Sequence, residues 1–487
     1  MKGSGLFPFL KDLNSISKRL HFGSEKGETD LRKSLSERVA DWYSRYFPDA
    51  FIFALVLTLL AMLFAVLFTD SGPISILGYW FEGVPMLFTF AFQLIITYAA
   101  ALVLVDTPVM QRIIKKMSSM VKRPTSAYVS VSIVGAVTSF IGWYIGPIIT
   151  ALFARSIGQN VKGVDYRLLS AVSYASFTIS LTGISGTIPL FVATEGNFTD
   201  ILGGIYPLQA TTFSTLNMVT AIAIVAVTTT IFYVIGKNKK DIVTFHDLAI
   251  KHEGETAAAI ETAENTEDIL VQKGSISDKI NNFRPAILII GLLGVVYLFY
   301  FFAINGIDGL NLNSVAFIAI ILGFLVHKNP MTYMDSFSKN ITATSSIALQ
   351  FPIYGGIAAI LIQSGLADKV TQMIVSVANE TTFPLFTFLI SGVINMFVPS
   401  AGSQFTATAA FIIPAAEELG VEIPRAILSI TYGDIWTNLV QPFWALLYFP
   451  ILAVGTRLTV RDFLGYCLPI LLAVGVIWAI GLTFLPL

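Results

Sequence analysis

The chain has 487 residues, of which 55% are hydrophobic and 13% are charged. Soluble globular domains carry about 25% charged residues, and the apolar residues here occur in runs of about 20, the length that crosses a bilayer. This composition excludes a soluble enzyme and predicts a polytopic membrane protein in contact with the lipid bilayer. The net charge of −1 gives no reason to expect nucleic acid as a partner.

Residues 1–48 contain many lysines and arginines but no clean apolar stretch, so they predict a cytoplasmic N-terminal segment rather than a signal peptide. Seven uninterrupted apolar runs follow, at 49–69, 84–105, 212–235, 285–304, 312–327, 341–363 and 464–487. Four longer runs are interrupted by glycine, proline and small polar residues, at 126–160, 165–194, 383–416 and 424–455. Backbone exposed by such breaks must face protein or a water-filled cavity. We therefore expect re-entrant hairpins at 126–160 and 383–416, and broken transmembrane helices in the other two runs.

The order of an intact run, two broken runs and an intact run occurs twice. Weak identities at an offset of 257 or 258, such as Gln93 with Gln350 and Tyr174 with Tyr432, accompany it. This pattern predicts two repeats joined by a cytoplasmic linker and a connecting transmembrane helix. The expected divisions are a first repeat at 49–236, the linker at 237–284, the connecting helix at 285–305 and a second repeat at 306–487.

The basic loops, such as 108–124 and 237–284, belong in the cytoplasm by the positive-inside rule, whereas 70–83, 195–211 and 305–311 contain no lysine or arginine. If both hairpins are re-entrant, the chain crosses nine times, with its N-terminus inside and its C-terminus outside. The repeats are then inverted, as is typical of secondary transporters. If both hairpins span fully, the inversion survives only with altered loops.

Asp434 is the only acid well inside a predicted crossing. An ionisable group at that depth is a functional-site hypothesis by default. We expect it to carry a proton or to bind a sodium ion, with Thr437 and Asn395 as further coupling-ion candidates. The structural alternative is a carboxylate that bonds to backbone amides freed by the break. Apart from a possible sodium ion, we expect no metal and no cofactor.

No lysine or arginine lies deep in any run, so an anion would have to be held by half-helix N-termini and small polar side chains. The candidate substrate-binding residues are Gly142, Gly146, Ser185, Gly186 and Thr187 in the first repeat, and Ser400, Gly402, Ser403, Gln404, Asn438 and Gln441 in the second. Packing glycines and serines, common in membrane bundles, are the alternative. Trp143 and Trp444 would form an apolar wall, anchor at the lipid interface or simply pack. For Gln93 and Gln350 we favour the scaffold over the site.

Several of these stretches resemble the bacterial short-chain fatty acid transporter family over about residues 37–487. The resemblance lies in Asn395-Met-Phe-Val-Pro-Ser-Ala-Gly-Ser-Gln404, Tyr432-Gly-Asp-Ile-Trp-Thr-Asn438, Ser185-Gly-Thr-Ile-Pro-Leu190 and Tyr46-Phe-Pro-Asp-Ala-Phe-Ile-Phe-Ala54. It implies uptake of acetoacetate and butyrate. It places the chain in an ion-transporter superfamily whose carriers have inverted repeats, a transport domain that moves by an elevator mechanism and a dimeric scaffold. A homodimer is the expected assembly, with 49–69, 84–105, 312–327 and 341–363 as scaffold.

The sequence therefore predicts an all-α polytopic protein of the bacterial inner membrane that imports a small organic anion, a short monocarboxylate, by coupling to H⁺ or Na⁺. A carrier of dicarboxylates or other organic anions is the alternative. An anion channel fits less well, because polar groups cluster only at the breaks and not along a continuous path. An intramembrane protease lacks the motif H-E-x-x-H and a second deep acid, so no enzymatic activity is expected.

Overall fold

The computed structural model describes residues 50–105, 107–250 and 275–487. These residues form helices and one isolated antiparallel bridge, between Ala249 and Thr456. The expected segment 1–48 and residues 251–274 of the expected linker lie outside the described residues. Eight helical stretches among the described residues are long and apolar enough to cross a membrane. They are Phe51–Phe68, Pro73–Val105, Pro124–Ile141, Tyr166–Val192, Thr215–Asn238, Ile276–Gly309, Pro330–Gln363 and Val460–Phe484. An all-helical polytopic membrane protein is confirmed at this level.

The helices of the first half, up to the linker, include both broken runs expected there. They are α3 (Ala50–Phe68), α4 (Pro73–Gly83), η1 (Val84–Leu87), α5 (Phe88–Val105), α6 (Pro108–Met120), α7 (Pro124–Ile141), α8 (Gly146–Asn160), α9 (Tyr166–Ala175), η2 (Ser176–Thr182), α10 (Thr187–Val192), α11 (Thr199–Leu202), α12 (Thr215–Asn238) and α13 (Phe245–Leu248).

The second half repeats much of this order. Its helices are α14 (Ile276–Asn281), α15 (Arg284–Asn305), η3 (Gly306–Gly309), α16 (Leu312–Val326), α17 (Pro330–Ile341), η4 (Thr342–Thr344), α18 (Ser345–Gln363), α19 (Leu366–Val377), α20 (Phe383–Asn395), α21 (Ala401–Glu418), α22 (Ile423–Thr437), α23 (Pro442–Ala453), α24 (Val460–Leu464), η5 (Gly465–Cys467) and α25 (Leu468–Phe484). The inversion of one half relative to the other stays a prediction.

The segment 70–83, expected as a loop, is largely helical. Helix α4 begins at Pro73, whose fixed φ suits the first turn of a helix, and continues through η1 into α5. Its last residue, Gly83, packs against α18 so closely that a Cβ there would lie 2.4 Å from the Ala359 Cβ. The absence of lysine and arginine from this segment therefore did not make it a loop.

Helices α7 and α8 form a tight antiparallel hairpin closed by residues 142–145. The Thr138 hydroxyl lies 3.3 Å from that of Thr150 across the pair. At the closed end a Cβ on Gly146 would come within 2.4 Å of the Ser139 backbone, so only glycine fits. Helices α20 and α21, joined by residues 396–400, are the corresponding pair in the second half. The helix pairs exist as expected, and their re-entrant placement in the membrane remains a prediction.

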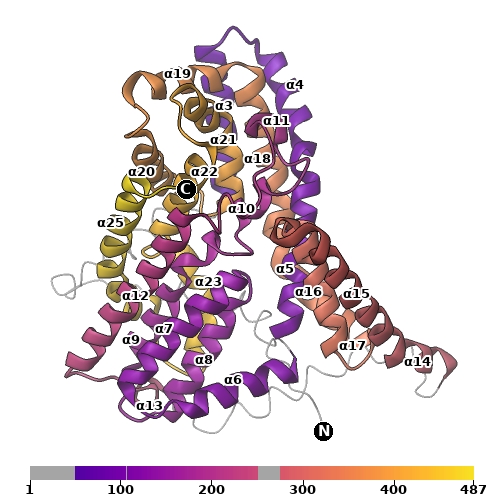
Figure 1. Ribbon diagram of the computed structural model, residues 1–487, viewed down its shortest axis with the longest axis vertical. Helices are drawn as coiled ribbons and strands as arrows, with labels where there is room; N and C mark the ends of the chain where they lie inside the picture. Colours follow the sequence, from indigo (N-terminus) through magenta and orange to yellow (C-terminus); the bar gives the residue numbers. More distant parts are fainter. Residues whose placement is uncertain (1–49, 106, 251–274) are drawn as a thin grey trace, which may run out of the picture.

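The helices pack into two groups (Figure 1). In the α5–α18 group, α18 packs against α3, α4 and α5, and α5 also packs against α16 and α17. In the hairpin group, α7 packs on α8, α9 and α12, while α22 packs on α20, α21 and α25. Helix α18 also contacts α21, so the second hairpin lies on the boundary between the groups. The four spans expected as scaffold thus contribute to the α5–α18 group.

The basic segments gather at one end of the molecule. Figure 1 shows α6, α13, α14 and α17 near its lower end, and α4, α11 and α19 near its upper end. At the lower end the described start of the linker bonds to the loop after α23, because Arg457 N donates to Leu248 O at 2.7 Å. The basic loops thus share one end of the molecule, as the positive-inside rule requires, and the side of the membrane that they face stays a prediction.

Candidate functional site

A cavity of about 150 Å³ lies where the two helix groups meet. A cavity of this size has room for several water molecules, the scale of a short organic molecule. Its walls come from α5, α18, the turns of both hairpins, the η2–α10 segment and α23. The lining residues are Leu94, Tyr98, Trp143, Leu181, Thr187, Ala343, Ser346, Ile347, Gln350, Phe351, Pro399, Ser400, Ala401, Gly402 and Trp444.

Three predicted substrate-binding residues line this cavity, namely Thr187, Ser400 and Gly402. Thr187 opens α10, in the broken run of the first half. Ser400 precedes α21 and Gly402 lies in its first turn, so both come from the second hairpin. The fold therefore brings breaks from the two halves of the chain, more than 200 residues apart in the sequence, to one place.

The cavity is uncharged, because none of its lining residues is Asp, Glu, Lys or Arg. Two of its lining residues, Trp143 and Trp444, carry an indole N–H group. The buried indole N–H of Trp444 has no acceptor among the described residues. The N–H of Trp143 lies near the Tyr144 hydroxyl but makes no hydrogen bond of normal geometry. A buried N–H without an acceptor is costly, and Trp444 carries such a donor beside the cavity.

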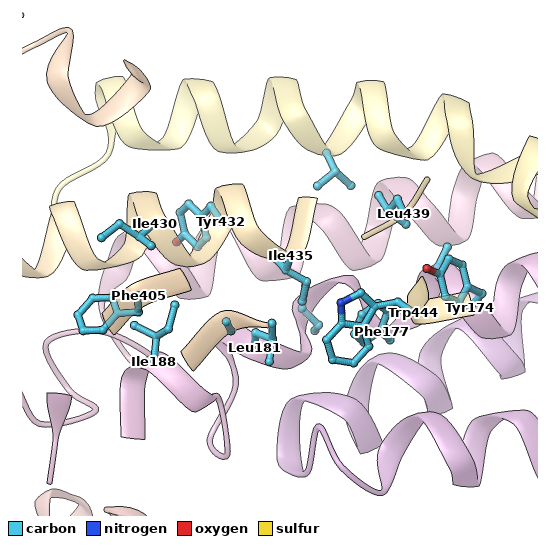
Figure 2. Packing of buried hydrophobic residues seen from close by; sticks show 14 of the residues in the cluster. Tyr174, Phe177, Leu181, Ile188, Phe405, Ile430, Tyr432, Ile435, Leu439 and Trp444 are labelled. Atoms are coloured by element: carbon cyan, nitrogen blue, oxygen red, sulfur yellow. The ribbon is translucent and has the colours of Figure 1, made fainter. Parts of the chain in front are cut away.

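The two tryptophans are held by aromatic packing. Their ring centroids lie 6.0 Å apart in an edge-on arrangement. Trp444 also packs at 5.6 Å on Phe177, and Figure 2 shows this pair beside Leu181. Trp143 lies 5.9 Å from Tyr98 of α5, across the boundary between the groups. The sequence left an apolar wall, an interface anchor and plain packing as alternatives for these rings, and both line the cavity.

The remaining first-half candidates support the cavity but do not line it. The Ser185 hydroxyl accepts a hydrogen bond of 2.8 Å from the Trp143 backbone N–H, which ties the broken run to the hairpin turn. Gly186 is the N-cap of α10, and a Cβ on it would lie 2.1 Å from Leu181 O. Gly142 ends α7 and Gly146 begins α8. These four residues hold Trp143 and Thr187 in position.

The other second-half candidates form a buried polar cluster where α20, α21 and α22 meet. Asn395 Nδ2 donates to Thr437 Oγ1 at 2.9 Å and to Asn438 Oδ1 at 2.6 Å. Gln441 Nε2 donates to the Asn395 carbonyl at 2.8 Å. Gln404 Nε2 donates to Ser391 O at 2.8 Å, one turn before Asn395 on α20. The amide nitrogens of Asn395, Gln404 and Gln441 therefore each donate to a neighbouring segment and join the helices.

The side-chain oxygens of the same three residues accept no hydrogen bond from the described residues. Asn395 Oδ1, Gln404 Oε1, Gln441 Oε1 and both carboxylate oxygens of Asp434 are buried and accept no hydrogen bond from the described residues. We call these four residues the oxygen cluster. Asp434 lies three and four residues before Thr437 and Asn438, hence on the face of α22 that meets Asn395. Uncompensated buried oxygens of this kind suit a hard cation such as Na⁺, which takes oxygen ligands.

Ser403 lies between the two sites. It is buried in the first turn of α21 and accepts a hydrogen bond of 3.0 Å from the Ser400 hydroxyl. The cavity and the oxygen cluster therefore share one short helical segment, 400–404. Of the groups that we assigned to the scaffold, Gln93 donates to Asn313 Oδ1 of α16 at 3.0 Å, as expected. Gln350 instead lines the cavity, and its position in the middle of an apolar run was the available signal.

The chain resembles known transporters along its whole length. Residues 31–485 match the family described as short chain fatty acid transporter. The chain is 34% identical over 449 residues to a proposed short-chain fatty acid transporter of Escherichia coli K12, covering 92% of this chain and 99% of that one. It is 32% identical over 462 residues to a protein of the same description from Haemophilus influenzae, covering 93% and 99%.

Two solved transporter structures share the fold. The YdaH transporter of Alcanivorax borkumensis aligns with a TM-score of 0.54, 13% identity, and coverage of 90% of this chain and 98% of that one. MtrF of Neisseria gonorrhoeae aligns with a TM-score of 0.55, 13% identity and coverage of 91% and 97%. At this identity the likeness concerns the fold alone. The family match over residues 31–485 and the relatives at more than 30% identity over nearly their whole length show that the chain belongs to the short-chain fatty acid transporter family.

Proposed function

We propose that the protein takes up short-chain monocarboxylates, with acetoacetate and butyrate as the expected substrates, by binding them in the cavity between the helix groups. The observation that carries this proposal is an uncharged cavity of about 150 Å³ lined by Trp143 and Trp444, of which Trp444 has a buried indole N–H without an acceptor among the described residues. A carboxylate accepts such bonds, and charge-assisted hydrogen bonds are about twice as strong as neutral ones. Leu94, Ile347 and Phe351 supply apolar wall for a short acyl chain. With no cation in the lining, one carboxylate fits better than two.

We assign Na⁺ as the coupling ion, held by the oxygen cluster. A proton can bind the carboxylate of Asp434 but leaves the amide oxygens of Asn395, Gln404 and Gln441 without a partner. One sodium ion satisfies several oxygens at once and neutralises the charge of the carboxylate. Together with a monocarboxylate, it makes the smallest neutral load.

The transport step we propose is an elevator motion of the hairpin group along the α5–α18 group. In this proposal both hairpins are re-entrant and the two halves of the chain are inverted. The α5–α18 group forms the interface of a homodimer. The position of the cavity supports the motion, because Trp143 and Ser400 come from the hairpin group while Tyr98 and Gln350 come from the other. Sliding one wall past the other would open the cavity first to one end of the molecule and then to the other.

The test is uptake of radiolabelled butyrate and acetoacetate into proteoliposomes, with sodium and pH gradients imposed separately. We expect saturable uptake driven by the sodium gradient and lost in Asp434→Asn. The matched control is Asp308→Asn, an exposed acid in η3 far from the cluster, which should transport normally. Uptake driven only by the pH gradient would replace Na⁺ by H⁺, and no saturable uptake under either gradient would refute the substrate assignment.

A further inference from the structure

A second and larger cavity, of about 610 Å³, lies at the end of the molecule where the basic loops gather. It is bounded by the start of α6, the start of α15 and the turn between α16 and α17. It shares no lining residue with the cavity of the proposed transport site. The turn is fixed to the segment before α15, because Asn329 Nδ2 donates to Asn282 Oδ1 at 2.8 Å.

The charge of this basic cavity is strongly positive. Four of its lining residues are cationic, namely Arg112, Arg284, Lys328 and Lys339, and only Asp335 is acidic. In the described part of the chain no ion pair joins Asp335 to Arg112, Arg284 or Lys328. With His327 neutral, the lining carries a formal excess of three positive charges. The hydroxyls of Thr332 and Ser336 add groups that can donate hydrogen bonds.

The dipoles of the neighbouring helices add to the positive potential in this cavity. Three helices begin at this cavity, α6 at Pro108, α15 at Arg284 and α17 at Pro330. Each helix N-terminus carries about half a positive charge and exposes backbone N–H groups that bind anions. The start of α15 has no side-chain cap hydrogen bond. Cationic side chains and helix ends thus converge on one space large enough for a multi-atom anion.

The surroundings of the basic cavity resemble a membrane interface. Exposed apolar side chains flank it on α6 and α17, among them Val109, Ile113, Met331 and Met334. A basic pocket beside such side chains, at the level where the positive-inside rule places the headgroups, matches the known pattern of anionic lipid recognition. We propose that the basic cavity binds the phosphate of an anionic phospholipid, with the acyl chains along α6 and α17. Inorganic phosphate is the other source of the same chemistry, and the experiment separates the two.

The experiment titrates purified full-length protein in neutral detergent with phosphatidylglycerol, phosphatidylcholine or inorganic phosphate. The thermal midpoint is followed, and retained lipid is identified by native mass spectrometry. We expect phosphatidylglycerol alone to raise the midpoint. In Arg284→Gln/Lys328→Gln its half-saturating concentration should rise by about twentyfold or more, because each basic residue near an anionic surface contributes roughly a factor of five.

The matched control is Lys115→Gln/Lys116→Gln, which removes two exposed charges from α6 that do not line the cavity. Its half-saturating concentration should stay within about threefold of the native value. Equal losses in both double variants would refute a specific pocket, and so would equal effects of phosphatidylcholine and phosphatidylglycerol. Stabilisation by inorganic phosphate alone would keep a phosphate site but refute the lipid. If the double variant folds poorly, the single variant Lys328→Gln, at an exposed position, replaces it in the same titration.

Discussion

Trp444 combines an aromatic ring with an indole N–H group. Its ring packs like any buried aromatic, but its indole nitrogen has no acceptor in the described structure. If that N–H binds the substrate carboxylate, Trp444→Phe keeps most of the packing and loses one hydrogen bond to a charged group, worth about 1.5–3 kcal/mol. We expect the KM for butyrate to rise at least tenfold.

Trp80→Phe is the matched control for this change. Trp80 of α4 also has a buried indole N–H without an acceptor, but it does not line the cavity. Its replacement should leave the KM unchanged in the same uptake assay. A similar rise of KM in both variants would show that the Trp444 effect comes from packing and not from the carboxylate.

Asn395 has two tasks in the oxygen cluster. Its nitrogen joins α20 to Thr437 and Asn438, and its oxygen is one of the proposed sodium ligands. Asn395→Ala should therefore raise the half-saturating sodium concentration of uptake tenfold or more, since it removes a ligand and frees its neighbours. Asn305→Ala, at the exposed end of α15, should not change it. An unaltered sodium dependence in Asn395→Ala would remove this residue from the ion site.

At the scale of elements, the first turn of α21 meets α18 with no space to spare. A Cβ on Gly402 would lie 2.9 Å from the tip of the Phe351 ring, which is itself buried and packed at 5.2 Å on Phe90. Gly402→Ala should lower the maximal uptake rate several-fold, because the hairpin must carry this Cβ past a ring with little room to move. Gly78→Ala in α4 meets nothing within 4 Å and should transport like the native protein. Normal uptake by Gly402→Ala would mean that this contact does not restrain the motion.

The elements also show which parts of the fold follow from sequence. Glycine and proline breaks located both helix pairs, because such residues interrupt the helix whatever the surroundings. Helices α4 and α17 were missed, because polar residues and turn formers within them resemble loops until neighbouring helices bury one face. The resulting crossings at Pro73–Val105 and Pro330–Gln363 are longer than expected.

For the whole molecule, the proposed motion predicts that joining the two walls of the cavity stops transport. Ser346 of α18 and Ser400 of the second hairpin line it from opposite groups. The chain has one cysteine, the buried Cys467, so Ser346→Cys/Ser400→Cys can be placed on a Cys467→Ser background. A bifunctional thiol reagent should abolish uptake by this pair and leave each single-cysteine variant active. Full uptake by the cross-linked pair would refute relative motion of the two walls.

The site could be predicted only in part, and the reason is spatial. Ser185 and Thr187 lie two residues apart in one break, yet the first bonds to the Trp143 backbone and the second lines the cavity. Likewise, Gly402 lines the cavity, whereas Gln404, two residues later, belongs to the oxygen cluster. A sequence shows that a break holds polar atoms, but which of them finds a partner depends on the neighbouring helix. The donor groups of Trp143 and Trp444 and the contribution of Gln350 needed the structure for the same reason.

The segment 400–404 has a thermodynamic consequence. Gly402 borders the cavity, and two residues later Gln404 presents its oxygen to the cluster on the same rigid helix start. A ligand that binds at either end of this turn and stabilises its conformation changes the binding free energy at the other site. Such linkage is reciprocal at equilibrium. If the bound cation raises the affinity for the carboxylate by some factor, the bound carboxylate raises the affinity for the cation by the same factor. The two dissociation constants are therefore expected to fall together, in equal ratio, in a carrier that moves only when fully loaded.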